Sequence, residues 1–407
     1  MNASKKQPIL RFTNYVGTDW QELALGDVAK IERGKFSPRP RNDPQFYGGD
    51  IPFAQTNDVS SSNGYIRSYS QTLNDKGLKV SKLFPKGTIL MTIAANIGYC
   101  GILYKPMACP DSLVGISCKK NTSNQFLNFY LNREQPRIDY LAPQAAQKNI
   151  NIEFLKPYKI FQPEQVKEQQ KIADFLTAVD TKISQLTEKH RLLKEYKKGV
   201  MQQLFSQQIR FKDDDGKAFP DWSEYKLKDI LVLQSDSLNM KDDETYELIT
   251  VKRRFGGIVS RGNYLGKDVL VKNQFTIHEN EFVISKRQIV HGACGLVPAE
   301  LDGSIVSNEY NVFRPKPQML DIDYFNRFAT TLFMRRAFFI NSDGVHIEKL
   351  LFKTQSWLKT KIQLSCLAEQ QKIAQFLQSI DTKIAAVAEQ IEQTQQFKKG
   401  LLQQMFV

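Results

Sequence analysis

Two stretches of the sequence place several cations beside glycine or proline, a pattern suited to contacts with a polyanion. In the first, RGKFSPRPRND, Gly34 permits a close approach of the backbone, and Pro38 and Pro40 favour an extended chain. In the second, VKRRFGGIVSRGNY, three successive cations precede Gly256 and Gly257 and could clamp a phosphate. Arginine pairs with guanine O6 and N7 or with phosphate, so both stretches suit base reading or anchoring on DNA. The candidate cations are Arg33, Lys35, Arg39, Arg41, Lys252, Arg253, Arg254 and Arg261.

Loop amides and further basic side chains extend this set, because amides pair with adenine and amines with phosphate. They are Gln55, Asn57, Asn96, Gln147, Lys148 and Asn149 in the N-terminal half, and Lys286, Arg287, His291, Asn308 and His346 in the C-terminal half. Capping of helices and turns is an alternative role for the amides, and simple exposure is one for the cations.

Motifs for bond chemistry are weak. Asp43-Pro44-Gln45-Phe46 is near the Asn/Asp-Pro-Pro-Tyr/Phe loop that grips an adenine amino group, but Gln replaces the second Pro and no glycine-rich cofactor loop precedes it. Asp221 and Glu224 mimic a nuclease motif, yet they lie three residues apart at a turn entering a strand, whereas metal-assisted cleavage needs groups from separate strands. No G-x-x-x-x-G-K-[ST] occurs. We therefore predict no catalytic residue in this chain.

The cysteines and the hydropathy pattern predict a cytoplasmic protein. The five cysteines, at positions 100, 109, 118, 294 and 366, form no C-x-x-C pair and have no histidine cluster nearby, which predicts reduced thiols and no metal site. No run approaches the roughly 18 apolar residues of a membrane helix, and the start MNASKKQP is not a signal peptide. We expect no membrane partner.

The charge is strongly positive and unevenly distributed. The formal net charge is +13, which favours a polyanionic partner. Residues 1–206 hold 29 Lys and Arg against 18 Asp and Glu, while residues 207–407 hold 27 against 25. If both halves contact nucleic acid, the first half supplies more of the phosphate contact. A basic surface that binds nothing is the alternative.

The elements that must position these loops occur twice. Segments 168–205 and 369–406 align at an offset of 201 residues, with 19 of 38 positions identical. The Arg-Phe step at Arg11 recurs at Arg210, and the start around Trp20 recurs around Trp222. Between these shared ends the halves diverge, and residues 34–57 have no obvious twin in residues 236–262. A common frame with divergent inserts predicts two related units of different specificity.

The repeated segments read as long helices with a heptad seam. Seam positions recur at alternating steps of four and three over nearly five heptads, and they are apolar except at His190, Lys197, Thr394 and Lys398. At about 1.5 Å per residue each helix spans roughly 57 Å. Each helix must bury this seam, and the other helix is the expected partner. The seam residues are Ile172, Leu176, Val179, Ile183, Leu186, Leu193, Val200, Leu204, Ile373, Leu377, Ile380, Ile384, Val387, Ile391, Leu401 and Met405.

We predict a mixed α/β protein with two globular domains joined by two long antiparallel coiled-coil helices and an internal pseudo-twofold axis. Segments 86–104 and 278–298 each read as a strand, a turn and a second strand. The predicted domains are residues 1–157 and 210–358, and the predicted spacer helices are residues 158–209 and 359–407. A parallel homodimeric coil is the alternative for the helices.

These residues resemble the specificity subunits of type I restriction-modification systems. The resemblance rests on the duplicated EQQKIA-F-L--D-KI opening of each long helix, the KKG---QQ-F ending, the W---L-L-D start of each module, and the strand, Gly turn and strand inside each divergent region. It covers essentially the whole chain. The duplicated order of domain, helix, domain, helix is more specific than any single motif.

The resemblance implies a two-headed reader of DNA. Each target recognition domain would read one half of a bipartite site in double-stranded DNA, and the helices would form an antiparallel spacer that fixes the gap. The spacer would dock two methyltransferase subunits, which use S-adenosylmethionine, and two ATP- and Mg²⁺-dependent restriction subunits would complete the complex. The specificity subunit itself would bind no cofactor and perform no bond chemistry. A freestanding DNA-modifying enzyme and a coiled-coil scaffold without DNA binding remain as alternatives.

Overall fold

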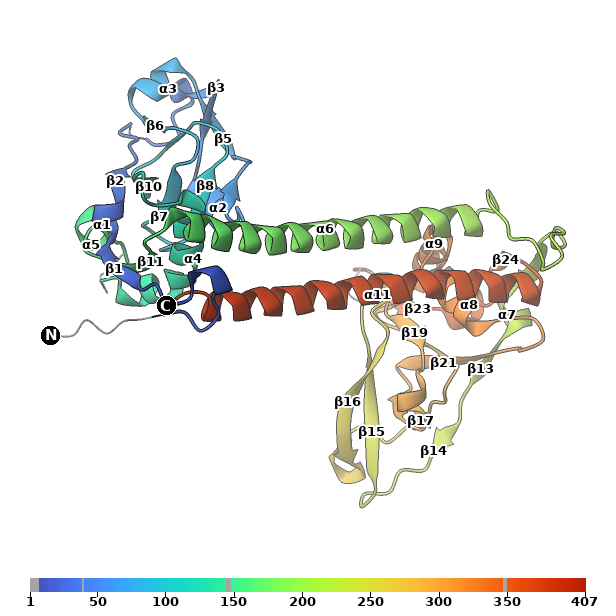
Figure 1. Ribbon diagram of the computed structural model, residues 1–407. Helices are drawn as coiled ribbons and strands as arrows, with labels where there is room; N and C mark the ends of the chain where they lie inside the picture. The colour runs from blue at the N-terminus through green and yellow to red at the C-terminus, as the bar shows by residue number, and fades with distance from the viewer. Residues whose placement is uncertain (1–6, 39, 144–147, 347–349) are drawn as a thin grey trace. The chain divides into compact units, whose positions relative to one another are not determined.

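The computed structural model describes residues 7–38, 40–143, 148–346 and 350–407 (Figure 1). The chain forms two compact units, of which unit 1 comprises Met1–Thr187 with Glu389–Val407 and unit 2 comprises Glu188–Ala388. Each unit holds one mixed α/β domain and parts of two long helices, α6 (Val166–Phe205) and α11 (Leu367–Gln404). Within the described ranges, no helix is both long and apolar enough to span a membrane.

The first domain, in unit 1, contains two main sheets. Their strand orders are β2-β10-β7-β8-β4 and β5-β3-β9-β6, and a short ladder pairs β1 with β11. The strands are β1 (Trp20–Ala24), β2 (Ala29–Arg33), β3 (Tyr47–Phe53), β4 (Tyr65–Ile66), β5 (Gln71–Leu73), β6 (Lys82–Phe84), β7 (Ile89–Thr92), β8 (Cys100–Leu103), β9 (Met107–Cys109), β10 (Leu113–Cys118) and β11 (Lys159–Pro163). The helices are η1 (Thr13–Tyr15), α1 (Leu25–Val28), η2 (Pro44–Phe46), α2 (Thr56–Ser60), α3 (Asp75–Lys79), α4 (Asn124–Leu141) and α5 (Ile152–Leu155).

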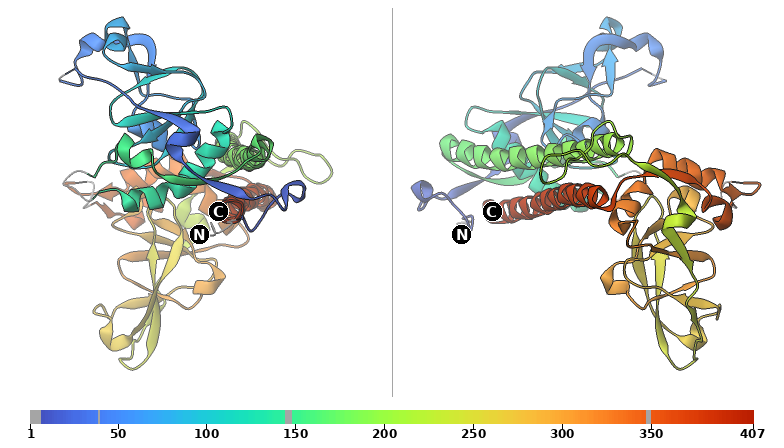
Figure 2. Two further views of the ribbon diagram at one scale, coloured as in Figure 1. Left: turned by 60° about the vertical axis from the view of Figure 1, so that its left-hand side comes forward. Right: turned by 90° about the vertical axis from the view of Figure 1, so that its right-hand side faces the viewer.

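The second domain, in unit 2, also has two main sheets, with the orders β13-β21-β18-β19 and β14-β17-β20-β15-β16. The long β15–β16 ribbon extends away from the helices of this unit (Figure 2). The strands are β12 (Ser223–Lys226), β13 (Leu231–Gln234), β14 (Ser237–Leu238), β15 (Thr245–Val251), β16 (Ile258–Leu265), β17 (Gln274–Thr276), β18 (Phe282–Ser285), β19 (Cys294–Leu296), β20 (Ile305–Ser307), β21 (Tyr310–Pro315), β22 (Ser342–Asp343), β23 (Leu351–Phe352) and β24 (Lys361–Leu364). The helices are α7 (Leu227–Ile230), η3 (Gly266–Asp268), η4 (Ile289–His291), η5 (Ala299–Leu301), α8 (Ile322–Phe328), α9 (Leu332–Ile340) and α10 (Thr354–Trp357).

The two domains share a topology, although their sequences between the repeated ends show little similarity. The order β2-β10-β7-β8 matches β13-β21-β18-β19, and β5-β3-β9-β6 matches β16-β15-β20-β17. In both domains one pair of the second sheet is parallel, with Phe53 opposite Ala108 and Leu248 opposite Ile305. Residues 34–57 and 236–262, which show no obvious likeness in sequence, therefore contain equivalent strands, β3 and β15. Side-chain identity was lost while the pairing was kept.

The strand, turn and strand expected in segments 86–104 and 278–298 are confirmed. Strand β7 pairs with β8 and β18 pairs with β19, in both cases antiparallel. All four residues of β7, β8 and β18 are buried. Three of the four hairpin strands are therefore fully buried, while β19, at the edge of its sheet, ends in the half-buried Leu296.

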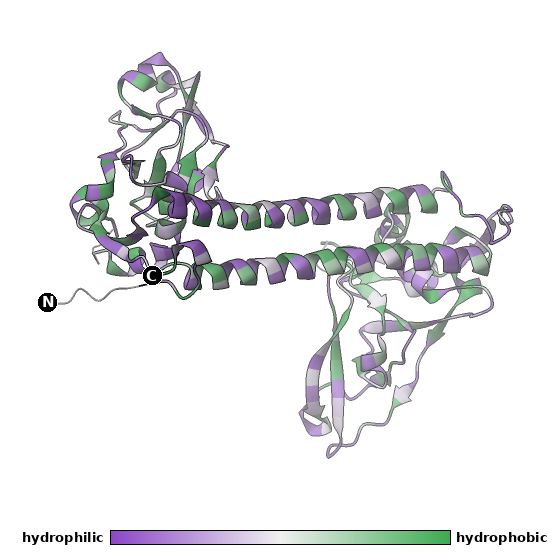
Figure 3. Cartoon of the chain, in the orientation of Figure 1, coloured by the Kyte–Doolittle hydropathy of each residue, from purple (hydrophilic) through white to green (hydrophobic). Residues whose placement is uncertain are grey.

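The two long helices each bury one face. Every one of the sixteen seam residues is buried or half-buried, and the neighbouring helix positions are mostly exposed. Hydrophobic and hydrophilic residues alternate along both helices (Figure 3). In unit 1 the seam residues Ile172, Leu176 and Val179 join a core cluster with Leu401 and Met405. In unit 2 a second cluster joins Val200 and Leu204 with Ile373, Leu377 and Ile380.

The spacer ranges 158–209 and 359–407 contain more than helix. Strand β11 precedes α6 and pairs with β1, and strand β24 precedes α11 and pairs with β12. These ladders fasten the start of each module to the residues directly before its helix. Helix α11 ends at Gln404, so Met405 and Phe406 lie just beyond its last turn.

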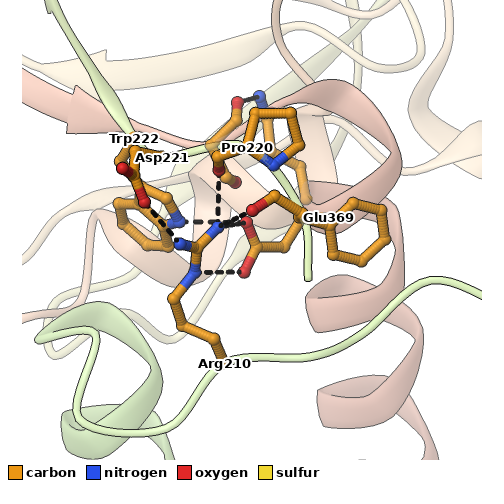
Figure 4. Close-up of polar contacts among 8 residues, drawn as sticks. Arg210, Pro220, Asp221, Trp222 and Glu369 are labelled. Atoms are coloured by element: carbon orange, nitrogen blue, oxygen red, sulfur yellow. Dashed lines mark hydrogen bonds and ion pairs between the residues drawn. The ribbon is translucent and has the colours of Figure 1, made fainter. Parts of the chain in front are cut away.

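A buried carboxylate ties each module start to its helix. In unit 2, Glu369 in the first turn of α11 has a fully buried side chain. Its oxygens accept hydrogen bonds from Arg210 Nε at 3.1 Å, Arg210 Nη2 at 2.9 Å and Trp222 Nε1 at 3.0 Å (Figure 4). Arg210 also donates to the Pro220 carbonyl at 2.6 Å, and it pairs with the exposed Asp221 at 3.3 Å. The hydrogen bond to Glu369 is the main cause that raises the pKa of Arg210.

Unit 1 repeats this anchor. Arg11 Nε and Nη2 donate to Glu168 at 2.7 and 2.9 Å, and the Glu168 side chain is only 1% exposed. The next residue of each helix adds a second tie. Gln169 Oε1 accepts from the Ser123 N–H at the start of α4 at 2.8 Å, and Gln370 Oε1 accepts from Asp321 N–H at the start of α8 at 2.9 Å. The repeated Glu-Gln pair therefore fixes each helix to its domain.

An aromatic cluster surrounds the end of each long helix, at Phe205 in α6 and at Phe406 just beyond α11. In unit 1, Phe406 lies 5.3 Å from Phe126 and 5.9 Å from Tyr130 between ring centroids, with Trp20 at 6.3 Å. In unit 2, Phe205 lies 5.3 Å from Tyr324 and 5.5 Å from Phe328. Helix α6 thus begins against the core of one domain and ends in the core of the other. The same holds for α11.

We expect Glu369→Ala to lower the free energy of unfolding by about 3 kcal/mol, because it leaves Arg210 and the Trp222 indole without their buried acceptor. Asp221→Ala is the matched control, since Asp221 contacts the same arginine from solvent, and its cost should stay below about 1 kcal/mol. Urea unfolding of the full chain measures both values. Equal costs for the two variants would show that the buried anchor does not stabilise unit 2.

Candidate nucleic-acid interface

The basic stretch of the first domain is organised by Asp111. Arg33 Nε donates to the Asp111 carbonyl at 2.8 Å, and Arg41 Nη2 reaches both carboxylate oxygens at 2.9 and 3.0 Å. Lys35 is exposed. Gly34 is packed against the domain itself, because a Cβ there would overlap the Pro110 carbonyl oxygen. The close approach that Gly34 permits is therefore to protein, and Arg39 lies outside the described residues.

Some candidate polar residues of the first domain have structural roles, and others are exposed. Gln55 is the N-cap of α2 and donates to Gln71 Oε1 at 2.9 Å, so its amide is partly used for structure. Asn57 in α2 and Asn96 in the β7–β8 turn are exposed. Asn149 is also exposed and forms an isolated bridge with Ala94 of that turn. Lys148 pairs with Asp139 at 2.9 Å, and Gln147 lies outside the described residues.

In the second domain, the β18–β19 turn is tied to the turn between β20 and β21. Arg287 pairs with Glu309 at 2.6 Å, and this hydrogen bond is the main cause that raises the Arg287 pKa. Lys286 Nζ donates to the carbonyl of Asn308. Asn308, another candidate for DNA contact, is exposed. Because their charged ends already hold structural contacts, Lys286 and Arg287 are weaker candidates for DNA contact than their positions suggested. His346 is exposed.

The turn Lys252–Gly257 has an unusual backbone. Arg254 and Phe255 both have positive φ, +61° and +56°, a conformation that costs a non-glycine residue on the order of 1–3 kcal/mol. Two hydrogen bonds hold it: Arg254 N–H donates to the His291 carbonyl at 2.7 Å and Phe255 N–H to the Gly292 carbonyl at 2.8 Å. Lys252, Arg253 and Arg254 are exposed at its surface. Arg261, also exposed, lies beyond it on β16, 5.9 Å from the Tyr264 ring centroid.

One cationic surface was not predicted from the sequence. In the first domain, Arg67 lies 4.5 Å and Lys86 lies 5.4 Å from the ring centroid of Tyr104, which is 51% exposed. Lys105 lies over the Tyr69 ring at 4.5 Å. Parallel pairing of β4 with β8 brings these residues together from segments almost forty positions apart. Alternating tyrosines and cations in residues 65–69 and 104–105 were the available signal.

The weak catalytic motifs have structural roles. Asp43 caps the short helix η2, where its side chain accepts from Gln45 N–H at 3.1 Å. Glu224 lies on β12 and pairs with Lys361 at 2.8 Å, while Asp221 belongs to the Arg210 anchor. The five cysteines are free, and burial raises the pKa of the Cys100, Cys109 and Cys294 thiols. Within the described ranges, no group of three His, Cys, Asp or Glu residues is placed to hold a metal ion.

Two α/β domains of one topology, each with exposed cationic loops and joined to long repeated helices, define a duplicated recognition protein. The chain belongs to the family of the type I restriction modification DNA specificity domain, whose model matches it twice, at residues 17–194 and 220–396. Both matches span a domain and the larger part of the helix that follows it.

Curated relatives carry the same family name. The chain is 27% identical over 242 residues to the type I restriction enzyme MjaIX specificity subunit of Methanocaldococcus jannaschii, covering 56% of this chain and 55% of the relative. It is 25% identical over 410 residues to the MjaVIII specificity subunit of the same organism, covering 95% and 92%. The alignments to MjaIX and to the putative MjaX subunit span about half of those proteins, 55% and 44%.

Solved structures show the same fold. The type I restriction-modification S subunit from M. genitalium superposes with a TM-score of 0.58 at 14% identity, over 99% of both chains. A second solved structure concerns the complex assembly and conformational transition of the type I R-M system. One of its chains superposes with a TM-score of 0.57 at 14% identity, over 95% of this chain and 97% of that chain.

We expect Arg254→Gly to raise the free energy of unfolding by roughly 0.5–1 kcal/mol, because glycine adopts positive φ without strain. Lys252→Gly is the matched control, since Lys252 lies in the same turn without positive φ. It should lower stability by about 0.5–1 kcal/mol through the entropy of the unfolded chain. Denaturant unfolding compares the two, and a loss of stability in Arg254→Gly would contradict the strain.

Proposed function

We propose that this chain is the DNA-reading subunit of a type I restriction-modification complex, and that each domain reads one half of a bipartite duplex target. The observation that carries the proposal is the duplicated topology with chemically different connections. Between the equivalent strands, the first domain inserts α2 and β4, with Gln55 and Asn57, whereas the second inserts the Lys252–Gly257 turn. Two copies of one frame with different polar surfaces are what two different half-sites require.

The helices would form the spacer, as an antiparallel coiled coil with pseudo-twofold symmetry. Two ion pairs that are equivalent in the repeat support this pairing. In unit 1, Lys398 binds Asp180 at 2.6 Å, and in unit 2, Lys197 binds Asp381. Each pair joins the late part of one helix to the early part of the other. Such polar contacts beside an apolar seam specify register.

The complex would contain two methyltransferase subunits docked on the helices and, through them, two restriction subunits. The methyltransferase would use S-adenosylmethionine, and the restriction subunits would use ATP and Mg²⁺. The exposed faces of α6 and α11 are available for docking, because burial is concentrated on the seam. This chain would contribute recognition and no bond chemistry, which fits the structural use of its carboxylate motifs.

The DNA contacts of the first domain would include the tyrosine-bound cations as well as Lys35 and Asn57. Arg67, Lys86 and Lys105 form no ion pair with any residue of the described ranges, so their charge is available to phosphate. Phosphate contacts position a protein on DNA, and the amide of Asn57 suits an adenine edge.

The test is base-modification sequencing of a host genome with and without this chain, co-expressed with a type I methyltransferase subunit from the same organism. We expect new N6-methyladenine at one split motif, two short half-sites around a fixed unspecified gap. Omitting the chain while keeping the methyltransferase is the control and should abolish the signal. Methylation at an undivided motif, or an equal signal without this chain, would contradict the proposal.

A further inference from the structure

The Lys252–Gly257 turn occupies a defined place in the second domain. It connects β15 to β16, just as α2 and β4 lie between the equivalent strands β3 and β5. It also packs on the central β18–β19 hairpin through its bonds to His291 and Gly292. The connection between β15 and β16 is therefore braced against the turn of the β18–β19 hairpin.

The turn is held rigidly. Besides the bonds to His291 and Gly292, Lys252 N–H donates to the Gly257 carbonyl at 2.9 Å. Phe255 lies directly over Gly292, where an added Cβ would be 2.8 Å from its ring. Arg335 covers the same ring, with its Cζ 4.7 Å from the centroid. Phe255 is thus clamped on two sides, and it fixes the backbone of the residue before it.

The side chain of Arg254 is exposed and uncommitted. Across the described part of the chain, its guanidinium forms no hydrogen bond, ion pair or ring contact. This differs from Arg287, Arg314 and Arg327, which are paired with carboxylates. A strained backbone that presents an unpaired arginine is stable only because the surrounding contacts enforce it.

The backbone of the turn is not arranged as a phosphate cradle. The N–H groups of Lys252, Arg254, Phe255 and Gly256 all donate to carbonyl groups of the domain. An anion site of the kind built from successive backbone N–H groups needs those donors free. Recognition by this turn must therefore come from its side chains.

We propose that Phe255 and its clamp position Arg254 to read a guanine in the half-site of the second domain, while Lys252 and Arg253 contact the flanking phosphates. The planar guanidinium donates two parallel hydrogen bonds to guanine O6 and N7, and a fixed backbone preserves that geometry. The inference rests on the proposed function and assigns one residue and one base within it.

The test compares the methylated motif of the wild-type complex with those of Arg254→Lys and Arg254→Gln. We expect the wild-type motif to contain a guanine that both variants no longer require, with a roughly 5- to 100-fold gain of methylation at sites altered at that position. The other half-site and the gap should be unchanged. Lysine keeps the charge but lacks the planar fork, so its failure separates base reading from charge.

Three further variants test whether Phe255 positions Arg254 and whether the effect is specific to this turn. Phe255→Ala should relax the same base position although Arg254 is intact, and Phe255→Tyr should restore the wild-type motif. Lys359→Gln, which removes an exposed cation elsewhere in unit 2, should leave the motif unchanged. Unfolding curves of all variants establish that the chain remains folded.

Two results would overturn this inference and leave the proposed function intact. The first is a normal motif in Arg254→Lys with uniformly weaker methylation in Arg254→Gln, which indicates a phosphate contact. The second is an unchanged motif in both. If the wild-type complex itself gave no split motif, the proposed function would fail, and this inference with it.

Discussion

The buried carboxylate in the first turn of each long helix is the interaction on which the rest of the structure depends. Glu168 and Glu369 each accept two hydrogen bonds from the arginine that begins their module, Arg11 or Arg210. A buried charge without its partner costs several kcal/mol, so this pairing leaves the helix little freedom to tilt against its domain. The ladders β1–β11 and β12–β24 reinforce the same joint. The direction of each domain is therefore set at the point where its helix starts.

Apart from that joint, the two domains share their sheets and differ in the connections between strands. The central hairpins and the parallel pairs are the same in both domains, whereas the connections between equivalent strands differ in length and chemistry. The first domain fills this place with a capped helix and an exposed Asn57, and the second fills it with a strained turn and an exposed Arg254. A connection of this kind changes its contacts without disturbing the sheets. Under the proposed function, this is how one scaffold would serve two half-sites.

Much of this arrangement is readable from sequence. The heptad pattern predicted both helices and their buried faces, and the alternation of apolar residues with a small-residue turn predicted both central hairpins. The equivalence of β3 and β15 was missed, because strand pairing tolerates nearly any apolar residue and leaves little identity to align. Arg11 and Arg210 were recognised as repeated positions, but their buried partners 157 and 159 residues away were not.

The candidate site was harder to predict, because residue type and spacing do not reveal which cations form structural contacts within the protein. Arg41 and Arg287 looked equivalent to Arg254 in sequence, yet Asp111 and Glu309 bind the first two. The Arg67, Lys86 and Tyr104 cluster depends on one parallel pairing between distant segments. Loop residues are therefore assigned by tertiary contacts, which local patterns do not encode.

The most direct test of the account is to copy the first domain into the place of the second. The equivalent ladders define the boundaries: residues 29–158 replace residues 231–360, and both anchors and both helices remain. We expect the methylated motif to become an inverted repeat of the half-site read by the first domain, with the gap unchanged. A folded, complex-forming chimera that kept the original second half-site, or altered the first, would show that the domains do not read independently.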